Sequence, residues 1–491
     1  GGEARSEGEQ VGEAEGEKGV VSPAGVWRGR SKKKGQALEM VKVADVVKHP
    51  EELVPLVQFY GKATRAPRLA QQSTPKWRFC FEHLLLVSRS FALVIMELEP
   101  EVRDAVCIFY LALRALDTIE DDTSVDAAKR IEACTNFYRH MDKKGWNCTG
   151  YGTKHEKNLL EKYDIVVDCF LELDERYQKT IRDITRRMGE GMAKHMAVTE
   201  CNTIEDYNTY CFYVAGLVGL GLSSLFYETG REDVSFVERT DLSIGMGLFL
   251  QKTNIIRDYL EDIQDGRTFW PRQIWSKYVS NLADLKEPHL RNKAVACLNH
   301  MVTDALTHIP DCIEYMGRIR NPYVFNFCAI PQVMAIATLA ELYNNPAVFE
   351  GCVKLRRGTT AKLVLQTTDF SKLLQLYYTS CVKIESKMDE SDPSADVTRS
   401  RLREVMNICL PHMPTVPDLT VLNRTAVVLF AGLVAYLIRR HSEADGILNT
   451  WRGGVPDVSE MIAVAALFLV MTYLMSFFGL QFVKTDRSVA N

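Results

Sequence analysis

The stretch that organises the chain is QKTNIIRDYLED, residues 251–262. Its polar residues recur at steps of three and four, so on a helix they form one stripe along a segment otherwise rich in Leu, Phe and Ile. Asp258 and Asp262 lie about one helical turn apart and can therefore point towards a common centre. The pattern predicts a helix whose polar stripe faces the interior of the protein.

Two carboxylates buried together repel, and one of them takes up a proton unless a cation lies between them. Hard oxygen ligands favour Mg²⁺, which is bound by one or two carboxylates and completed by substrate phosphates. One acidic helix face is more often simply solvated. The stretch RALDTIEDD, residues 114–122, repeats the Asp-x-x-Glu-Asp spacing and again carries a nearby arginine. Two such stripes facing each other would hold a cluster of magnesium ions.

The composition narrows the class of protein. The chain has 491 residues with 46% apolar content, which allows a large core. Its net charge of −4 argues against a general nucleic-acid-binding surface, so no nucleic-acid partner is expected. The thirteen cysteines include no C-x-x-C pair and the ten histidines form no H-E-x-x-H motif. These patterns favour free thiols in a reducing compartment over disulfides or a zinc site.

The chain is expected to form one large helical domain. Residues 1–37 are rich in Gly and Glu with few large apolar side chains, so we expect a disordered extension. Residues 38–390 show no alternating strand pattern, and apolar residues recur there with a helical period. An all-α domain is predicted, a helix bundle with a central cavity walled by the carboxylate faces. The apolar stripes cover 77–98, 101–121, 156–198, 204–229, 239–262, 289–318, 322–345 and 366–389.

The composition changes after residue 390. Residues 391–425 are interpreted as a linker. The apolar segment 426–438 is too short to span a bilayer easily and is expected to be interfacial or re-entrant. Residues 461–483 carry no charge and would extend about 34 Å as a helix, which suffices to cross a membrane. We expect this one span to anchor the chain, with the large domain in the cytosol.

Six motifs between about residues 40 and 390 together resemble the squalene synthase (farnesyl-diphosphate farnesyltransferase) family. They follow the family's order, which is more specific than either acidic motif alone. The motifs are SRSF at 88–91, LRALDTIEDD at 113–122, YCFYVAGLVG at 210–219, QKTNIIRDYLED at 251–262, FNFCAIPQVM at 325–334 and VKLRRG at 353–358.

The resemblance implies an isoprenoid-synthase-type helical bundle around a central cavity, with a C-terminal membrane anchor. It also implies a two-step reaction. Two farnesyl diphosphates join head to head into presqualene diphosphate, which is then rearranged and reduced to squalene. The implied cofactors are Mg²⁺ and NADPH. The implied location is the endoplasmic reticulum membrane, with the catalytic domain facing the cytosol, and a monomer is expected.

The resemblance also assigns roles to individual residues. The metal ligands would be Asp117, Glu120, Asp121, Asp258 and Asp262. The four aspartates among them would also be catalytic. Two aromatic residues would act on the cationic intermediates, namely Tyr210 in the first step and Phe327 in the second. Phosphate groups of substrate or cofactor would be bound by Arg89, Arg114, Arg257, Lys354 and Arg356. Substrate would also contact Ser88, Phe91, Gln251 and Asn254.

Simpler interpretations remain open at this point. The aromatic residues could be ordinary core, Arg114 and Arg257 could form ion pairs with neighbouring aspartates, and the basic run at 354–357 could be a solvated or membrane-facing patch. NADPH rests on the resemblance, because no strand precedes the glycines at 216–221 to make a dinucleotide fingerprint. Those glycines are expected to allow close helix packing or to leave room for a prenyl chain.

Two alternative functions are also compatible with the residues. One is a phytoene-synthase-like prenyltransferase, which performs the same type of condensation without NADPH. The other is a non-catalytic, membrane-anchored protein that binds prenyl diphosphates. The basic run at 354–357 and the predicted anchor argue against the first, and the intact acidic motifs argue against the second.

Overall fold

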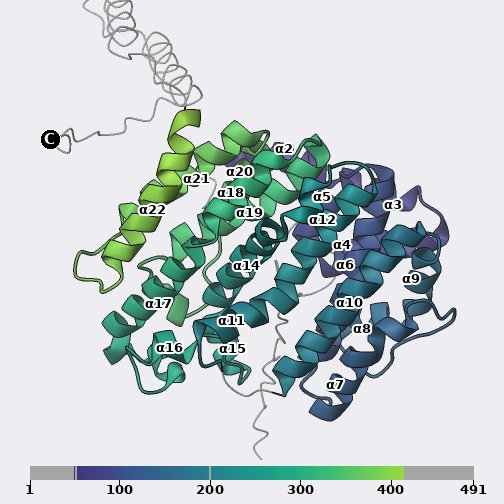
Figure 1. Ribbon diagram of the computed structural model, residues 1–491, viewed down its shortest axis with the longest axis horizontal. Helices are drawn as coiled ribbons and strands as arrows, with labels where there is room; N and C mark the ends of the chain where they lie inside the picture. The colour runs from purple at the N-terminus through teal and green to yellow at the C-terminus, as the bar shows by residue number, and fades with distance from the viewer. Residues whose placement is uncertain (1–48, 50–51, 198–200, 414–491) are drawn as a thin grey trace, which may run out of the picture. The chain divides into compact units, whose positions relative to one another are not determined.

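The computed structural model describes residues 49, 52–197 and 201–413. The predicted extension at 1–37 and the apolar segments 426–438 and 461–483 lie outside these residues. Every regular element in the described part of the chain is helical, so the all-α prediction is confirmed (Figure 1). The elements of the first half are α2 (Leu53–Ala63), α3 (Arg65–Gln71), α4 (Pro75–Val87), α5 (Arg89–Met96), α6 (Pro100–Asp121), α7 (Ala127–Asn136), η2 (Phe137–His140), α8 (Lys154–Glu161), α9 (Tyr163–Phe170), α10 (Glu175–Met196), α11 (Ile204–Cys211), η3 (Phe212–Gly216) and α12 (Leu217–Glu228).

The second half continues in the same way. Its elements are α13 (Ser235–Glu238), α14 (Thr240–Arg257), α15 (Tyr259–Gln264), α16 (Arg272–Trp275), η4 (Leu282–Lys286), η5 (Pro288–Leu290), α17 (Arg291–Leu306), α18 (Ile309–Arg318), α19 (Pro322–Leu342), η6 (Pro346–Phe349), α20 (Arg357–Gln366), α21 (Phe370–Glu385), α22 (Ala395–Cys409) and η7 (Leu410–His412). The element η3 is a short π-helix, and the other η elements are 3₁₀ turns.

Helix α14 lies in the middle of the bundle, and α12, α17, α18 and α19 pack against it (Figure 1). Helix α10 runs beside α6, α7 and α12. Both acidic motifs lie at the carboxyl ends of long buried helices, 114–121 in α6 and 251–257 in α14. The carboxyl end of a helix carries a partial negative charge, so these ends increase the need for a nearby cation.

Glycines allow η3 and α12 to approach α14 closely. A Cβ atom on Gly219 would lie 2.1 Å from the backbone oxygen of Ser243, and one on Gly247 would lie 2.2 Å from that of Ala215. Real Cβ atoms cannot come so close, so the two backbones touch only because both positions are glycine. The expectation that small residues in this region allow close helix packing is confirmed.

The helix predicted across 251–262 is interrupted at Asp258. Helix α14 ends at Arg257, Asp258 has φ −94° and ψ 12°, and α15 begins at the next residue. The amide of Asp258 still donates to the carbonyl of Asn254 at 2.9 Å, and that of Asp262 to the carbonyl of Asp258 at 3.0 Å. The interruption is therefore local, and periodicity alone could not predict it because the chain keeps its helical path.

The helical domain continues past the predicted boundary at residue 390. Helix α22 packs against α17, α18 and α21 and buries Leu402, Val405 and Cys409. The Asp- and Ser-rich turn before it resembles a linker in sequence, but the Asp392 side chain accepts hydrogen bonds from Ser394 and from the Asn299 side chain. These bonds fix the turn to α17. A linker beginning at 391 is therefore wrong for the residues up to 409.

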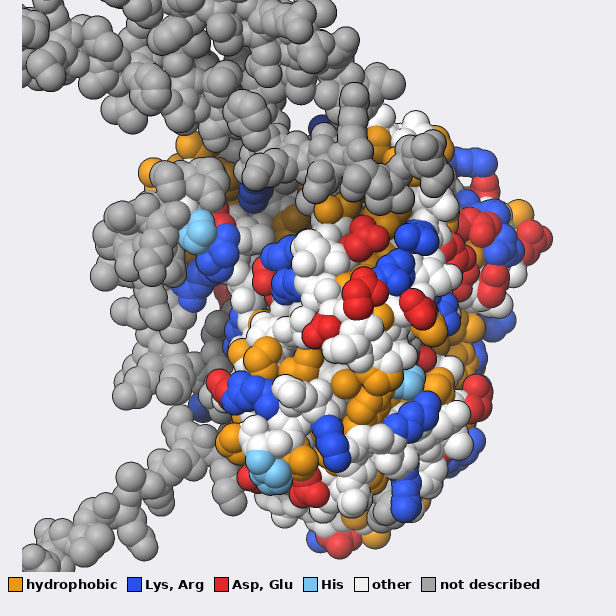
Figure 2. Space-filling model, turned by 90° about the vertical axis from the view of Figure 1, so that its left-hand side faces the viewer, with side chains coloured by type: hydrophobic (Ala, Val, Ile, Leu, Met, Phe, Trp, Pro, Cys, Tyr) orange, Lys and Arg blue, Asp and Glu red, His pale blue; other side chains and the backbone are white. Residues whose placement is uncertain are grey.

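Two stretches of the described chain are long and apolar enough to cross a membrane, Ile204–Glu228 and Pro322–Leu342. Within them, 56% and 78% of the most apolar windows are buried inside the domain. They are therefore explained as core helices. The domain surface mixes acidic and basic side chains with small hydrophobic areas on the face drawn in Figure 2.

Candidate active site

The two acidic motifs face each other across a single arginine. Arg267 donates from Nη1 to Oδ1 of Asp121 at 3.0 Å and from Nη2 to Oδ1 of Asp262 at 3.1 Å. Its guanidinium also lies 3.5 Å from Asp265. Arg267 lies 146 positions from Asp121 in the sequence. The sequence did not identify it as a site residue.

The carboxylates of this site are deeply buried. Asp117, Glu120, Asp121, Asp258 and Asp262 are each at most 8% exposed. Burial raises the pKa of Glu120 well above its ordinary value, and the charges of Asp121 and Asp117 add to the effect. The pKa of Asp262 is likewise raised well above its ordinary value, mainly by burial. The site therefore carries more negative charge than its surroundings neutralise.

A divalent metal fits this arrangement. One carboxylate oxygen of Glu120 is buried and has no hydrogen-bond partner among the described residues. Hard carboxylate oxygens are the ligands that Mg²⁺ prefers. A dication near these oxygens would lower the electrostatic cost that raises the pKa values of Glu120 and Asp262. The donor set of both motifs therefore suits Mg²⁺.

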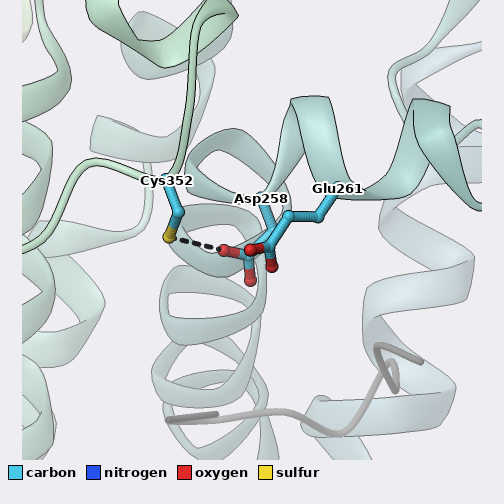
Figure 3. Close-up of side chains that lie close together, drawn as sticks. All are labelled: Asp258, Glu261 and Cys352. Carbon is cyan, nitrogen blue, oxygen red and sulfur yellow. Dashed lines mark hydrogen bonds between the residues drawn. The ribbon is translucent and has the colours of Figure 1, made fainter. Parts of the chain in front are cut away.

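The two aspartates of the second motif have different partners. One oxygen each from Asp258 and Glu261 and the sulfur of Cys352 lie within 4.8 Å of one another (Figure 3). The Cys352 thiol lies 3.6 Å from Oδ1 of Asp258, and burial, with the Asp258 charge, raises its pKa to about 11. A protonated thiol is a poor ligand for Mg²⁺, so Asp258 and Glu261 are the better pair. Glu261 belongs to the repeated spacing but was not among the predicted ligands.

Two of the predicted arginines, Arg257 and Arg114, are engaged in ion pairs. Arg257 donates to both oxygens of Asp258, at 2.7 and 2.5 Å, as the simpler interpretation proposed. Arg114 instead pairs with Glu156 of α8 at 3.1 Å, which is not one of the neighbouring aspartates. Arg89 is the first residue of α5. Fixed guanidinium groups beside carboxylates are suited to binding phosphate oxygens as well.

Three polar residues predicted to contact substrate are buried. Gln251 and Asn254 lie one helical turn apart on α14 and are 1% and 8% exposed. Ser88 lies between α4 and α5 and is also buried. The Asn254 amide nitrogen and the Ser88 hydroxyl have no hydrogen-bond partner among the described residues. Buried polar groups normally have partners, so these atoms are suited to a ligand.

Tyr210 lies beside the acidic site in an aromatic stack. Its ring centroid is 4.9 Å from that of Phe269 and 4.1 Å from that of His195. The Tyr210 hydroxyl is buried without a hydrogen-bond partner among the described residues. Burial raises its pKa well above the ordinary value, and the charge of Glu120 adds to this. The π-helix η3 begins two residues later, a distortion that is common at functional sites.

Phe327 and Phe91 form part of a second aromatic group. Their ring centroids are 6.2 Å apart, with an interplanar angle of 68°. Phe226 lies 6.0 Å from Phe327, and Tyr110 lies 6.4 Å from Phe91. We call these four residues, contributed by α5, α6, α12 and α19, the aromatic cluster. Its predicted members do come together, and it also serves as core packing.

The predicted cofactor residues lie apart from the carboxylates in sequence, at the start of α20. Lys354 and Arg356 are exposed. Arg356 donates to Oε1 of Glu52 at 2.8 Å, and the Thr359 hydroxyl donates to the same oxygen at 2.9 Å. Burial would raise the pKa of Glu52, but these two hydrogen bonds lower it. A carboxylate thus occupies a site whose donors and helix N-terminus also suit a phosphate.

An all-helical bundle with opposed, buried carboxylates at two helix ends defines a protein of the isoprenoid-synthase class. The family model for squalene/phytoene synthase matches residues 85–359. Squalene synthase 1 of Panax ginseng is 52% identical over 368 residues, which cover 74% of this chain and 87% of that protein. A squalene synthase of Nicotiana benthamiana is 50% identical over 367 residues, covering 74% and 88%.

A solved structure agrees with these relatives. The complex of TcSQS with the ligand BPH1237 superimposes with a TM-score of 0.68 at 44% identity, covering 69% of this chain and 100% of that one. The chain therefore belongs to the squalene/phytoene synthase family.

Proposed function

We propose that this protein is a squalene synthase, which converts two farnesyl diphosphates through presqualene diphosphate into squalene. The observation that carries the proposal is the meeting of two buried acidic motifs, bridged by Arg267, in a chain 52% identical to a squalene synthase. Such a site is adapted to a diphosphate leaving group, because bound cations neutralise both the substrate and the charge released as the C–O bond breaks.

The metal-binding residues are proposed to be Asp117, Glu120, Asp121, Asp258 and Asp262, and Glu261 joins them on its position beside Asp258. Mg²⁺ bound there would supply charge stabilisation for the departing diphosphate. Asn254 and Gln251 would orient the diphosphate by hydrogen bonds, and the buried amide of Asn254 has a donor to offer. Arg257 would hold Asp258 in place and present its outer edge to a phosphate oxygen.

Tyr210 is proposed to handle a proton in the first step. Its hydroxyl lies in a buried setting, and its high pKa keeps it protonated at neutral pH. The phenol can therefore donate to a departing diphosphate oxygen while its ring face stabilises a neighbouring cation. The stack with Phe269 and His195 would hold the ring in one orientation. His195 has its pKa lowered to about 4 by burial and is neutral, so it adds no repelling charge.

The aromatic cluster is proposed to shield the second step. A carbocation is captured by any water that reaches it, so the cavity wall has to be dry. Phe327 is 3% exposed and contacts Phe91 and Phe226. These rings would exclude water and offer π density to the cation without a nucleophilic atom.

NADPH is proposed to be held by Lys354 and Arg356, with Arg89 and Arg114 binding phosphate groups of substrate or cofactor. NADPH would supply the hydride for the second step. For location, we propose that residues 461–483 anchor the protein in the endoplasmic reticulum membrane as a monomer, with the catalytic domain in the cytosol and with 426–438 at the interface.

The proposal is tested by product analysis with farnesyl diphosphate and Mg²⁺, with and without NADPH. We expect squalene to form with NADPH and presqualene diphosphate to accumulate without it. A phytoene-synthase-like enzyme would consume substrate to the same product in both cases, and a binding protein would not consume it. The curated relatives described above are squalene synthases and do not favour these alternatives.

A further inference from the structure

Arg267 differs from the other arginines at the site in what it joins. Arg257 pairs with the adjacent Asp258, and Arg114 pairs with Glu156 outside the acidic motifs. Arg267 contacts one aspartate of each motif, and its side chain is only 17% exposed. Its guanidinium carbon also lies 5.7 Å from the centre of the Phe269 ring. The Arg267 guanidinium therefore links α6, α15 and the aromatic stack of Tyr210.

The turn after α15 positions Arg267 between the two acidic motifs. Helix α15 ends at Gln264, and Gly266 follows with φ 73°, a left-handed conformation that favours glycine. The Arg267 amide then donates to the carbonyl of Asp262 at 2.9 Å. This turn directs the chain back over the second motif, so the guanidinium reaches across to Asp121. The turn therefore fixes the backbone from which this side chain extends.

The bridge occupies oxygens that a metal would need. Oδ1 of Asp121 and Oδ1 of Asp262 both accept from Arg267. A guanidinium and a divalent cation cannot share these atoms without strong repulsion. The Nε–H of Arg267 has no partner among the described residues, so this group keeps a donor for an anion such as a diphosphate oxygen.

We propose that Arg267 is the internal counter-ion of the active site: it holds the two acidic motifs together before the metal binds and releases Asp121 and Asp262 as the metal and diphosphate enter. This inference rests on the proposed function, since it assumes that the motifs bind Mg²⁺. It makes metal binding weak in the absence of substrate and coupled to the arrival of the diphosphate, whose negative charge offers the guanidinium a new partner.

The test measures metal binding without any turnover. Mn²⁺ binding to the full-length protein is followed by electron paramagnetic resonance with no substrate, for wild type, Arg267→Gln and Arg267→Lys. We expect Arg267→Gln to bind Mn²⁺ about tenfold more tightly, because the competing positive charge is gone. Its melting temperature should fall in EDTA and recover when Mn²⁺ is added. Arg267→Lys keeps the positive charge but cannot donate to Asp121 and Asp262 from two separate nitrogens, and should tighten Mn²⁺ binding by about threefold.

Arg239→Gln is the matched control. Arg239 also joins two carboxylates, Asp241 and Glu314, but it lies at the opposite end of α14 and is partly exposed. We expect it to change neither the Mn²⁺ affinity nor the effect of Mn²⁺ on melting. The inference is overturned if Arg267→Gln and Arg267→Lys bind Mn²⁺ as wild type does. Should Arg267→Gln not fold, Arg267→Lys alone decides.

The same samples separate this inference from the proposed function. If wild type forms squalene and the two variants bind Mn²⁺ like wild type, the counter-ion role fails and the function stands. If wild type forms no squalene, the function fails, and tighter Mn²⁺ binding by the variants would still establish the role of Arg267 at a metal site.

Discussion

In each of two regions of the molecule, a charged side chain of the protein lies among groups that would bind a ligand of the same charge. At the acidic site, Arg267 lies between carboxylates of the two motifs. At the start of α20, Glu52 lies among the basic and hydroxyl groups of Arg356 and Thr359. The difference lies in the groups around that side chain: the Asp121 and Asp262 side chains are 4% and 9% exposed, whereas the Arg356 side chain is 47% exposed. Exchange of charge is therefore costly at the first region and easy at the second.

The largest effect is expected from removing single charges at the acidic site. Asp117→Asn and Asp258→Asn should each lower kcat by about 10³-fold, because each removes a proposed metal ligand at the diphosphate. Stability should be unchanged or higher for Asp117→Asn, since a buried repelling charge is lost. It should fall for Asp258→Asn, since the buried Arg257 loses its partner. Squalene formation and thermal melting are measured on the same preparations. Asp396→Asn on α22, whose carboxyl side chain is 98% exposed, is the control. Unchanged turnover in both site variants would rule out the metal-cluster mechanism.

The next largest effect concerns Tyr210. Tyr210→Phe retains the stack with Phe269 but removes the hydroxyl that has no partner among the described residues. We expect kcat for presqualene diphosphate formation to fall about 10²-fold with little change in KM, because proton transfer contributes in the transition state. Presqualene diphosphate supplied directly should still be converted. Tyr207→Phe, a buried neighbour on α11, controls for loss of a tyrosine hydroxyl. Equal losses in both half-reactions would contradict a first-step role.

How far the sequence predicts these regions can be judged residue by residue. The proposed ligands on α6 and α15, with Asp258 between α14 and α15, follow from helical spacing and from the repeated Asp-x-x-Glu-Asp pattern. Arg267 follows a recognisable Asp-Gly turn, but no spacing rule tells where a long side chain reaches after it. Glu52 meets Arg356 across 304 residues, and Cys352 reaches Asp258 from a distant loop. Such long-range contacts depend on tertiary packing, which local periodicity does not encode.

His195 provides a prediction about acid stability. Burial lowers its pKa to about 4 from an ordinary value of 6.5. Between pH 4 and pH 6.5, the imidazole is therefore protonated in the unfolded chain but neutral in the folded chain. Stability from this group is therefore complete above pH 6.5 and decreases as the pH falls towards 4. At pH 5 the loss is about 2 kcal/mol. His195→Phe should retain the stack with Tyr210 and reduce the difference between urea unfolding at pH 8 and pH 5. His289→Gln on the 3₁₀ turn η5 is the control.

The smallest effect is expected at the exposed region, where Glu52 occupies the proposed phosphate site of the cofactor. Glu52→Gln keeps the shape of the side chain but removes the charge that competes for Arg356. We expect the KM for NADPH to fall about threefold while kcat and the KM for farnesyl diphosphate stay the same. Glu350→Gln, which removes a glutamate paired with Arg291 on the surface, should change none of these values.

Arg356→Gln sharpens the same test because it should raise the KM for NADPH. Opposite shifts from Glu52→Gln and Arg356→Gln would indicate that the carboxylate and the cofactor compete for one guanidinium. A rise in KM from both variants would mean instead that Glu52 positions Arg356 for the cofactor, and the parallel with Arg267 would then fail. Because Glu52 directly precedes α2, the competing carboxylate is supplied by the N-terminal helix of the described domain. Cofactor affinity would then depend on how firmly α2 packs against α20.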